Sequence, residues 1–143
     1  MDKIIKTTMY TSFIFTVGLI LFWIGITWYP FKAATFYPPT VYTPYVKAGD
    51  LFVYDMNFVK HARIRPKIQR ILISEKKGNP IIILENAIGV SRVGQNTRQV
   101  KVEIPKSVDP GKYRLQTFLQ YPYFGGLRMV EYDVYTDVFE VYR

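Results

Sequence analysis

Cysteine is absent from this 143-residue chain, and histidine occurs only once, at His61. Without cysteine the chain has no disulfide bond, thiol nucleophile or thiolate metal ligand. A histidine that acts as a base or a metal ligand needs companions, but His61 lies between Lys60 and Arg63 with no carboxylate near it in sequence. Glycine-rich phosphate loops and nucleophile elbows are also missing. We therefore expect no enzymatic activity, and we assign no catalytic, cofactor-binding or metal-binding residue.

Acidic residues are scarce, because 11 Asp and Glu stand against 19 Lys and Arg, for a formal net charge of +8. The densest acidic group consists of Glu131, Asp133, Asp137 and Glu140. Glu131 and Asp133 would share one face of an extended strand, an arrangement that could bind calcium. Alternating charge on the solvent face of an edge strand explains the same residues without a metal, and we prefer this interpretation.

Charge is entirely missing from the stretch Met9 to Tyr29, which is the longest apolar run of the chain. As a helix, this run would be about 30 Å long, the thickness of the hydrocarbon core of a bilayer. A cleavable signal peptide has a shorter apolar region followed by small residues, whereas aromatic residues and Pro30 follow here. A buried helix of a soluble domain would carry a polar stripe. We predict a transmembrane helix over residues 9–29 that acts as a signal anchor, with the lipid bilayer as its partner.

The flanks of this helix predict its orientation. Lys3 and Lys6 precede it, and Lys32 is the only charge that closely follows it. By the positive-inside rule, we expect residues 1–8 to be cytoplasmic and the C-terminal domain to be extracytoplasmic, in the periplasm or at the cell surface. A viral membrane stays open as the setting. The predicted anchors at the membrane interface are Trp23, Trp28, Tyr29 and Phe31.

Four prolines distinguish residues 30–46 from the rest of the chain. Proline fixes φ and lacks a backbone donor, so we expect neither a helix nor a central strand here. The interpretation is a semi-rigid spacer, which could extend over roughly 50 Å at about 3.1 Å per residue. Its many aromatic residues leave open that part of it lies on the domain.

Alternation of apolar and polar residues begins at Lys47 and continues to Arg143. Aromatic residues make up 17% of the chain, which favours strands over helices. Gly89 and Gly94 interrupt the pattern, and residues 75–80 form a charged turn. The predicted strands are 51–59, 68–74, 81–84, 99–104, a long strand over 113–121, and a return strand from 130. This spacing predicts an all-β domain over 47–143, folded as an antiparallel β-sandwich.

The two C-terminal strands carry a more specific signal. Residues 124–127 include two glycines and suit a hairpin turn. On the return strand, Val130, Tyr132 and Val134 would face inward, but Phe139 has the opposite parity. A change of parity needs one extra residue, so we predict a β-bulge near residues 136–137.

Asp109-Pro110-Gly111-Lys112-Tyr113 forms a D-x-G-x-Y pattern directly before the long strand. It resembles the tyrosine corner of immunoglobulin-like β-sandwiches, in which a tyrosine at the start of the sixth strand bonds back to the preceding loop. The resemblance implies structural roles for Asp109, Gly111 and Tyr113. The paired cysteines of that family are missing, Leu115 occupies the position of the second one, and the domain has no tryptophan. A cysteine-free, bacterial type of immunoglobulin-like domain tolerates these departures, and a jelly roll remains an alternative.

A basic segment supplies the only candidate ligand site. Arg63, Arg65 and Lys67 alternate with Ile64, Pro66 and Ile68, so in extended chain they would form one basic ridge. Such a ridge could bind an anionic ligand, namely lipid phosphates, a glycan or nucleic acid. A solvated edge strand protected by its charges explains the same pattern. The candidate ridge consists of Lys60, Arg63, Arg65, Lys67 and Arg70.

Two functions follow from these features. The first is a non-catalytic structural or assembly subunit, whose domain packs against other proteins of a bacterial or phage membrane complex or a membrane-containing virion. The second is a membrane-tethered module that binds an anionic ligand through the basic ridge. We prefer the first, since no catalytic group competes with it, and disfavour nucleic acid because the domain is expected to face away from the cytoplasm. Self-association into a homo-oligomer stays open.

Overall fold

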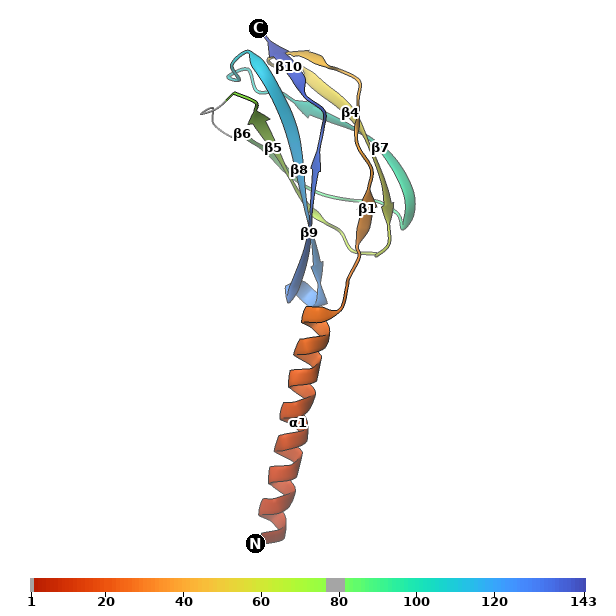
Figure 1. Cartoon of the computed structure of the whole chain (residues 1–143), viewed down its shortest axis with the longest axis vertical. Coiled ribbons are helices and arrows are strands. Elements are labelled where there is room, and N and C mark those ends of the chain that lie inside the picture. Colours follow the sequence, from red (N-terminus) through yellow and green to blue (C-terminus); the bar gives the residue numbers. More distant parts are fainter. Residues whose placement is uncertain (1, 77–81) are drawn as a thin grey trace. The chain divides into compact units, whose positions relative to one another are not determined.

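The computed structural model describes residues 2–76 and 82–143, with all of their side chains except those of Asp2, Lys3 and Glu85. The chain divides into two compact units, residues 1–31 and 32–143, which are drawn in Figure 1. Of the charged turn expected at 75–80, residues 77–80 lie outside the described residues.

The first unit contains the α-helix α1, Asp2–Trp28, whose 27 residues extend over about 40 Å. It is the one helix in the described chain that is long and apolar enough to cross a membrane. The helix begins before the predicted segment and ends one residue before its end. The hydroxyls of Thr8, Thr16 and Thr27 donate to the backbone carbonyls four residues earlier, at 2.8–2.9 Å. These bonds satisfy polar groups on an otherwise apolar surface.

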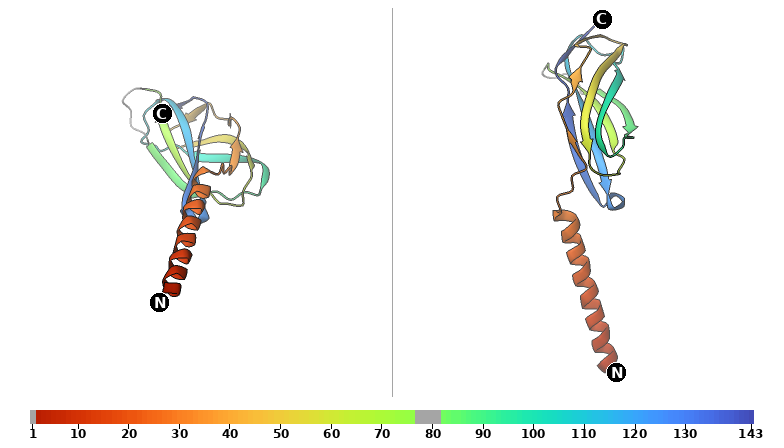
Figure 2. Two further views of the ribbon diagram at one scale, coloured as in Figure 1. Left: turned by 60° about the horizontal axis from the view of Figure 1, so that its bottom comes forward. Right: turned by 90° about the vertical axis from the view of Figure 1, so that its right-hand side faces the viewer.

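The second unit is mostly β and contains two sheets. One sheet has β4 at its centre, with β7 along one edge and the short β1 and β2 along the other. The other sheet has the order β3-β10-β8-β5-β6, and β9 pairs with β8 beside β10. In the right-hand view of Figure 2, β4 and β7 lie in front of this second sheet. The bounds are β1 Ala34–Phe36, β2 Thr40–Val41, β3 Tyr45–Lys47, β4 Leu51–Lys60, β5 Lys67–Ser74, β6 Ile82–Ile88, β7 Gly94–Glu103, β8 Gly111–Tyr123, β9 Arg128–Tyr135 and β10 Phe139–Tyr142.

The core lies between the two sheets and follows the alternation of the sequence. Even-numbered residues of β4, from Phe52 to Phe58, are buried, and their odd-numbered neighbours are at least partly exposed. Odd-numbered residues of β8, from Tyr113 to Tyr121, are buried in the same way. Both sets belong to strands that the sequence predicts. Two described strands are longer than predicted, because β6 continues to Ile88, directly before Gly89, and β7 begins at Gly94.

The predicted bulge near residues 136–137 is confirmed by the pairing of β8. Gln116 pairs with Tyr135 on β9, whereas Tyr113 pairs with Phe139 on β10, so the register slips by one residue between the two strands. Thr136 fills the irregularity, because its N–H donates to the Leu115 carbonyl and its hydroxyl accepts from the Leu115 N–H at 3.1 Å. The β8–β9 turn contains a short 3₁₀ turn, η1 (Phe124–Gly126), in which Gly125 and Gly126 both have positive φ.

Residues 30–46 do not form the predicted extended spacer, because β1, β2 and most of β3 lie within them. Ala33 and Ala34 are fully buried, and Ala34 pairs with Lys60 of β4. The second unit therefore begins at Lys32 instead of Lys47, and the extended length expected for the spacer is not available. The predicted antiparallel pairing has one exception, because β3 pairs with β10 in parallel. Every other strand pair among the described residues is antiparallel.

Candidate functional site

The basic segment does not form one continuous ridge. Arg63 and Arg65 are exposed in the β4–β5 loop, and Lys67 is exposed at the start of β5. Lys60 is buried, with 3% of its surface exposed, and its Nζ donates to the Ser91 carbonyl at 3.0 Å. Burial is the main cause that lowers the pKa of Lys60, and the charge of Arg65 is the second. Of the five predicted residues, only Arg63, Arg65 and Lys67 are exposed as a surface ridge requires.

Arg70, the last member of the predicted ridge, faces into the domain. It has the same parity on β5 as Ile68 and Leu72, which pack into the core, and it pairs across the sheet with the buried Thr117. Lys67 lies at the opposite parity of the same strand and is exposed. Adding Arg70 to a surface ridge was therefore wrong, because the alternation of β5 sends its side chain to the inner face.

Two cationic depressions result from this arrangement. The outer groove is lined by four cationic side chains and the β6–β7 loop, namely Lys60, Arg63, Arg65, Val90, Ser91, Arg92 and Val93. The inter-sheet pocket has a volume of about 220 Å³ and lies between β5 and β6 on one side and β4 and β7 on the other. Ser91 lines both, so the loop between β6 and β7 separates them.

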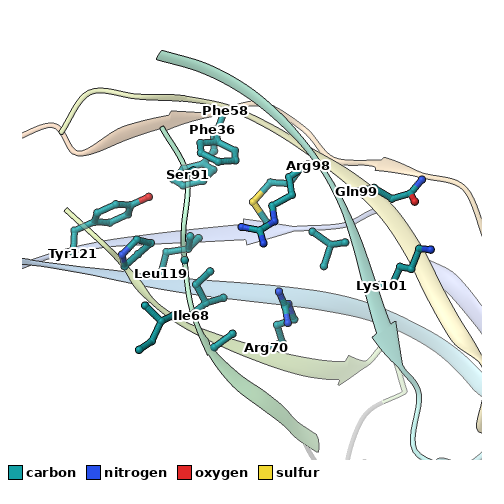
Figure 3. A pocket seen from close by; sticks show the side chains of 16 residues that line it. Phe36, Phe58, Ile68, Arg70, Ser91, Arg98, Gln99, Lys101, Leu119 and Tyr121 are labelled. Carbon is teal, nitrogen blue, oxygen red and sulfur yellow. The ribbon is translucent and has the colours of Figure 1, made fainter. Parts of the chain in front are cut away.

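Arg70 and Arg98 extend into the inter-sheet pocket from opposite sheets, as Figure 3 shows. Arg98 has the parity of the buried Val100 on β7, but its own side chain is exposed. Gln99 and Lys101 of the same strand are exposed as well and also line the pocket (Figure 3). Among the lining residues whose side chains are described, none is acidic. The described lining therefore contains three cationic side chains, those of Arg70, Arg98 and Lys101, and no carboxylate.

The two arginines differ in how well their donors are satisfied. Arg98 Nη1 donates to the Val90 carbonyl at 2.9 Å. The Nε of Arg70 is buried and has no hydrogen-bond partner. A buried donor without a partner is unusual and costly, so it suggests a group that binds there.

A β-bulge lies beside Arg70. Gln69 pairs with Asn86 and Ile71 pairs with Ile83, so two residues of β6 oppose the single residue Arg70 of β5. Bulges re-aim side chains and are frequent next to functional sites.

Tyr121 forms part of the apolar wall of the pocket, together with Leu119 and Phe58. Burial, with smaller contributions from Tyr132 and Tyr123, raises the pKa of Tyr121 to about 12. Its hydroxyl is therefore neutral at physiological pH and adds no negative charge to oppose the arginines.

The remaining predicted residues have structural surroundings. Tyr113 Oη donates to the Asp109 carbonyl at 2.8 Å, which is the bond that the D-x-G-x-Y pattern predicts. His61 is exposed, its Nε2 lies 2.9 Å from Thr35 Oγ1, and it lines neither depression.

The acidic group on β9 is engaged by glutamines of β8. Gln116 Nε2 donates to Asp133 at 2.7 Å, and Gln120 Nε2 donates to Glu131 at 2.8 Å. No cluster of three or more potential metal ligands occurs in the described part of the chain. Cross-strand hydrogen bonds therefore hold Glu131 and Asp133, two of the four acidic residues of this group.

Sequence reasoning missed Arg98 and Arg92. The predicted strand at 99–104 ended one residue short of Arg98, although its alternation, extended by one step, places Arg98 beside Val100 on the inner face. Arg92 lies in the β6–β7 loop, where no periodicity indicates which way a side chain points.

No family of proteins and no curated protein matches the sequence. Among solved structures, the chain is similar to a ceramidase complexed with C2, with 13% identity and a TM-score of 0.46 over 75% of this chain and 19% of that chain. It is also similar to the neutral ceramidase from Pseudomonas aeruginosa, with 12% identity and a TM-score of 0.44 over 81% and 20% of the two chains. A third is the alkylpurine DNA glycosylase AlkC of Pseudomonas fluorescens, with 11% identity and a TM-score of 0.42 over 78% and 31%. The chain thus spans less than a third of each of these proteins, and such similarity indicates no shared function.

Proposed function

We propose that this protein is a non-catalytic module, anchored in a membrane by α1, whose β domain binds an anionic ligand. The apolar helix supports the anchor, and Lys3 and Lys6 near its start support a cytoplasmic N-terminus with an extracytoplasmic domain. The main support for anion binding is that Arg70 and Arg98 both line the inter-sheet pocket, whose described lining contains no acidic side chain.

We also propose an immunoglobulin-like fold for the β domain. The parallel pairing of β3 with β10 lets the N-terminal segment contribute to both sheets, β1 to one and β3 to the other. The bond from Tyr113 to the Asp109 carbonyl has the form of a tyrosine corner. Leu115 is fully buried where the family has its second cysteine, so packing replaces the disulfide at that position.

Electrostatics favour an anion over an empty pocket. The guanidinium groups of Arg70 and Arg98 line the same pocket, and the buried Nε–H of Arg70 has lost water without gaining a protein acceptor. A carboxylate or phosphate would supply both the opposite charge and acceptor oxygens, and arginine binds these groups in a two-pronged geometry. The outer groove, with Lys60, Arg63, Arg65 and Arg92, would draw anions toward this end of the domain.

The test uses the full-length protein in phosphatidylcholine nanodiscs, with inorganic phosphate and octanoate as probes. NMR signals of the arginine Nε–H groups report the binding, and we expect the Arg70 signal to shift at the lowest probe concentrations. Arg70→Met and Arg98→Met should each weaken binding at least tenfold. Lys67→Met is the matched control, because it removes a charge from the opposite face of the same strand, and it should change affinity less than twofold.

The proposal is wrong if neither probe shifts the Arg70 signal, or if sodium chloride at equal ionic strength shifts it equally. It is also wrong if Lys67→Met weakens binding as much as Arg70→Met, because general surface charge would then explain the effect.

A second candidate function is the assembly subunit that we preferred from sequence. It is favoured by exposed tyrosines around the edge strand β3, where Tyr45 is 68% and Tyr142 is 48% exposed. Exposed aromatic residues on an edge strand suit a protein interface.

The double variant Tyr45→Ser/Tyr142→Ser should reduce the size of the complex in native membranes, measured after gentle solubilisation. Tyr37→Ser, an equally exposed tyrosine that follows β1 of the other sheet, is the control and should leave the size unchanged. An unchanged size in the double variant would contradict this role.

A further inference from the structure

We infer that the ligand of the inter-sheet pocket is an anionic amphiphile, with its carboxylate or phosphate on Arg70 and Arg98 and the start of its apolar chain between the sheets. This inference rests on the proposed anion-binding function and adds the class of ligand. Fatty acids and single-chain lipid phosphates share the required chemistry.

The lining of the pocket is mostly apolar, which suits the apolar chain of the ligand. Apart from the cationic side chains, Gln99 and Ser91, the described lining is apolar or aromatic, and it comes from both sheets and the β6–β7 loop. These residues are Phe36, Met56, Phe58, Pro66, Ile68, Ala87, Ile88, Gly89, Val100, Leu119 and Tyr121. A site for a purely polar anion such as free phosphate would be lined with backbone N–H groups and hydroxyls. A wall of this composition instead favours a ligand with an apolar body.

The size of the pocket limits that body. Its volume of about 220 Å³ exceeds the roughly 150 Å³ of a dry cavity that accommodates benzene. It lies below the range of about 300–1,000 Å³ typical of sites for drug-sized ligands. The pocket therefore suits a short stretch of a single chain.

The two arginines lie beside apolar residues of the same pocket, so one ligand can contact both. Arg70 is half-buried and Arg98 is exposed, and both line the pocket together with Ile68 and Val100 of their own strands. A bound head group on Arg70 and Arg98 would hold the first carbons of its chain against these neighbours. Tyr121, which stays neutral, repels no anion from the apolar wall.

The wall near the β6–β7 loop depends on close backbone packing. A Cβ atom on Gly89 would lie 2.6 Å from the Cγ of Pro66, and both residues line the pocket. Glycine at this position lets the loop close one side of the pocket against β5.

The test is a chain-length series with full-length protein in phosphatidylcholine nanodiscs, using acetate, butanoate, hexanoate and octanoate labelled with ¹³C at the carboxyl carbon. Empty nanodiscs provide the background from partition into lipid. We expect affinity to rise roughly fourfold per methylene added until the pocket is filled, since each methylene leaves water for an apolar wall. Octyl phosphate should bind like octanoate, and octyltrimethylammonium should bind at least tenfold more weakly.

The variants assign the effect to the two halves of the site. Arg70→Met and Arg98→Met should abolish the preference for octanoate over octyltrimethylammonium, whereas Lys67→Met should retain it. Acetate that binds as tightly as octanoate would overturn the amphiphile while leaving the anion-binding function intact. If no anion of either series binds, both proposals fail. Equal binding of the cationic amphiphile would overturn the role of the arginines.

One further arm distinguishes the source of the amphiphile. Labelled octanoate is bound in nanodiscs that contain either phosphatidylcholine alone or phosphatidylcholine with lysophosphatidylglycerol. Displacement in the second set supports the inference with a bilayer lipid as the source. Retention supports it with an amphiphile taken from solution.

Discussion

The core between the two sheets has a closed end and an open end, and they are built differently. At the closed end, Phe52 stacks on Phe139 with ring centroids 4.0 Å apart, and Ile104 and Leu115 are fully buried. At the open end, the inter-sheet pocket lies between the same two sheets and is lined by Arg70 and Arg98. One end is arranged for stability, and the other carries charges that a stable core would exclude. Destabilising features placed together in one region are typical of functional sites.

Phe52→Ala should have the largest effect, because it opens the closed end. Phe52 is fully buried and contacts the rings of Tyr54 and Phe139. Loss of a buried aromatic ring leaves a cavity and costs about 3–5 kcal/mol of unfolding free energy. Urea unfolding of the full-length protein in micelles, followed by near-UV circular dichroism of tyrosine, measures this change. A loss below about 1 kcal/mol would show that this end is not the stable part of the core.

Tyr121 predicts a pH dependence located at the open end. Its pKa is raised from 10 to about 12 in the folded protein, so between these values the folded state holds a proton that the unfolded state has lost. The stabilisation is fully present below pH 10 and is lost as the pH rises toward 12, by roughly 2–3 kcal/mol. Urea unfolding at pH 9 and pH 11.5 measures it. Tyr121→Phe should remove most of the difference, and an unchanged difference in that variant would assign it to other groups.

The closed end could be read from the sequence, and the open end only in part. Even-numbered residues of β4 and odd-numbered residues of β8 alternate regularly, so their inner faces and the bulge at Thr136 follow from parity alone. Arg70 was assigned to the surface because a run of cationic residues usually lies there. The parity that it shares with Ile68 and Leu72 placed it inside instead.

The strands within residues 30–46 could not be predicted by the same means. β1, β2 and β3 contain two or three residues each, which is too short for a period-two pattern. They form because β4 and β10 offer unpaired edges to them, and that is a property of the assembled sheets. The prolines at 38, 39 and 44 lie between these strands, where the lack of a donor costs nothing.

Arg70→Met at the open end should raise the stability of the domain, whereas Phe52→Ala at the closed end should lower it. The variant removes a half-buried charge and a buried Nε–H that has no partner, and the methionine side chain fills similar space. In the absence of anions, we expect the unfolding free energy to rise by about 1–2 kcal/mol. Excess octanoate should reverse the order, because only the original protein gains from binding it. A loss of stability without ligand would mean that Arg70 belongs to the structural core.

The smallest expected effect is that of Tyr113→Phe, which tests whether the closed end depends on polar contacts as well as on packing. The hydroxyl of Tyr113 donates to the Asp109 carbonyl at 2.8 Å, while the ring lies in the core and would keep its place in the variant. Removal of one such hydrogen bond costs about 1 kcal/mol. Because Arg70 and Arg98 lie at the other end of the core, the variant should leave the affinity for octanoate within twofold of the original. Urea unfolding and the arginine NMR titration, carried out on the same sample, measure both quantities. Should the binding weaken together with the stability, the two ends would form one cooperative unit, and the separation of a stable end from a binding end would be wrong.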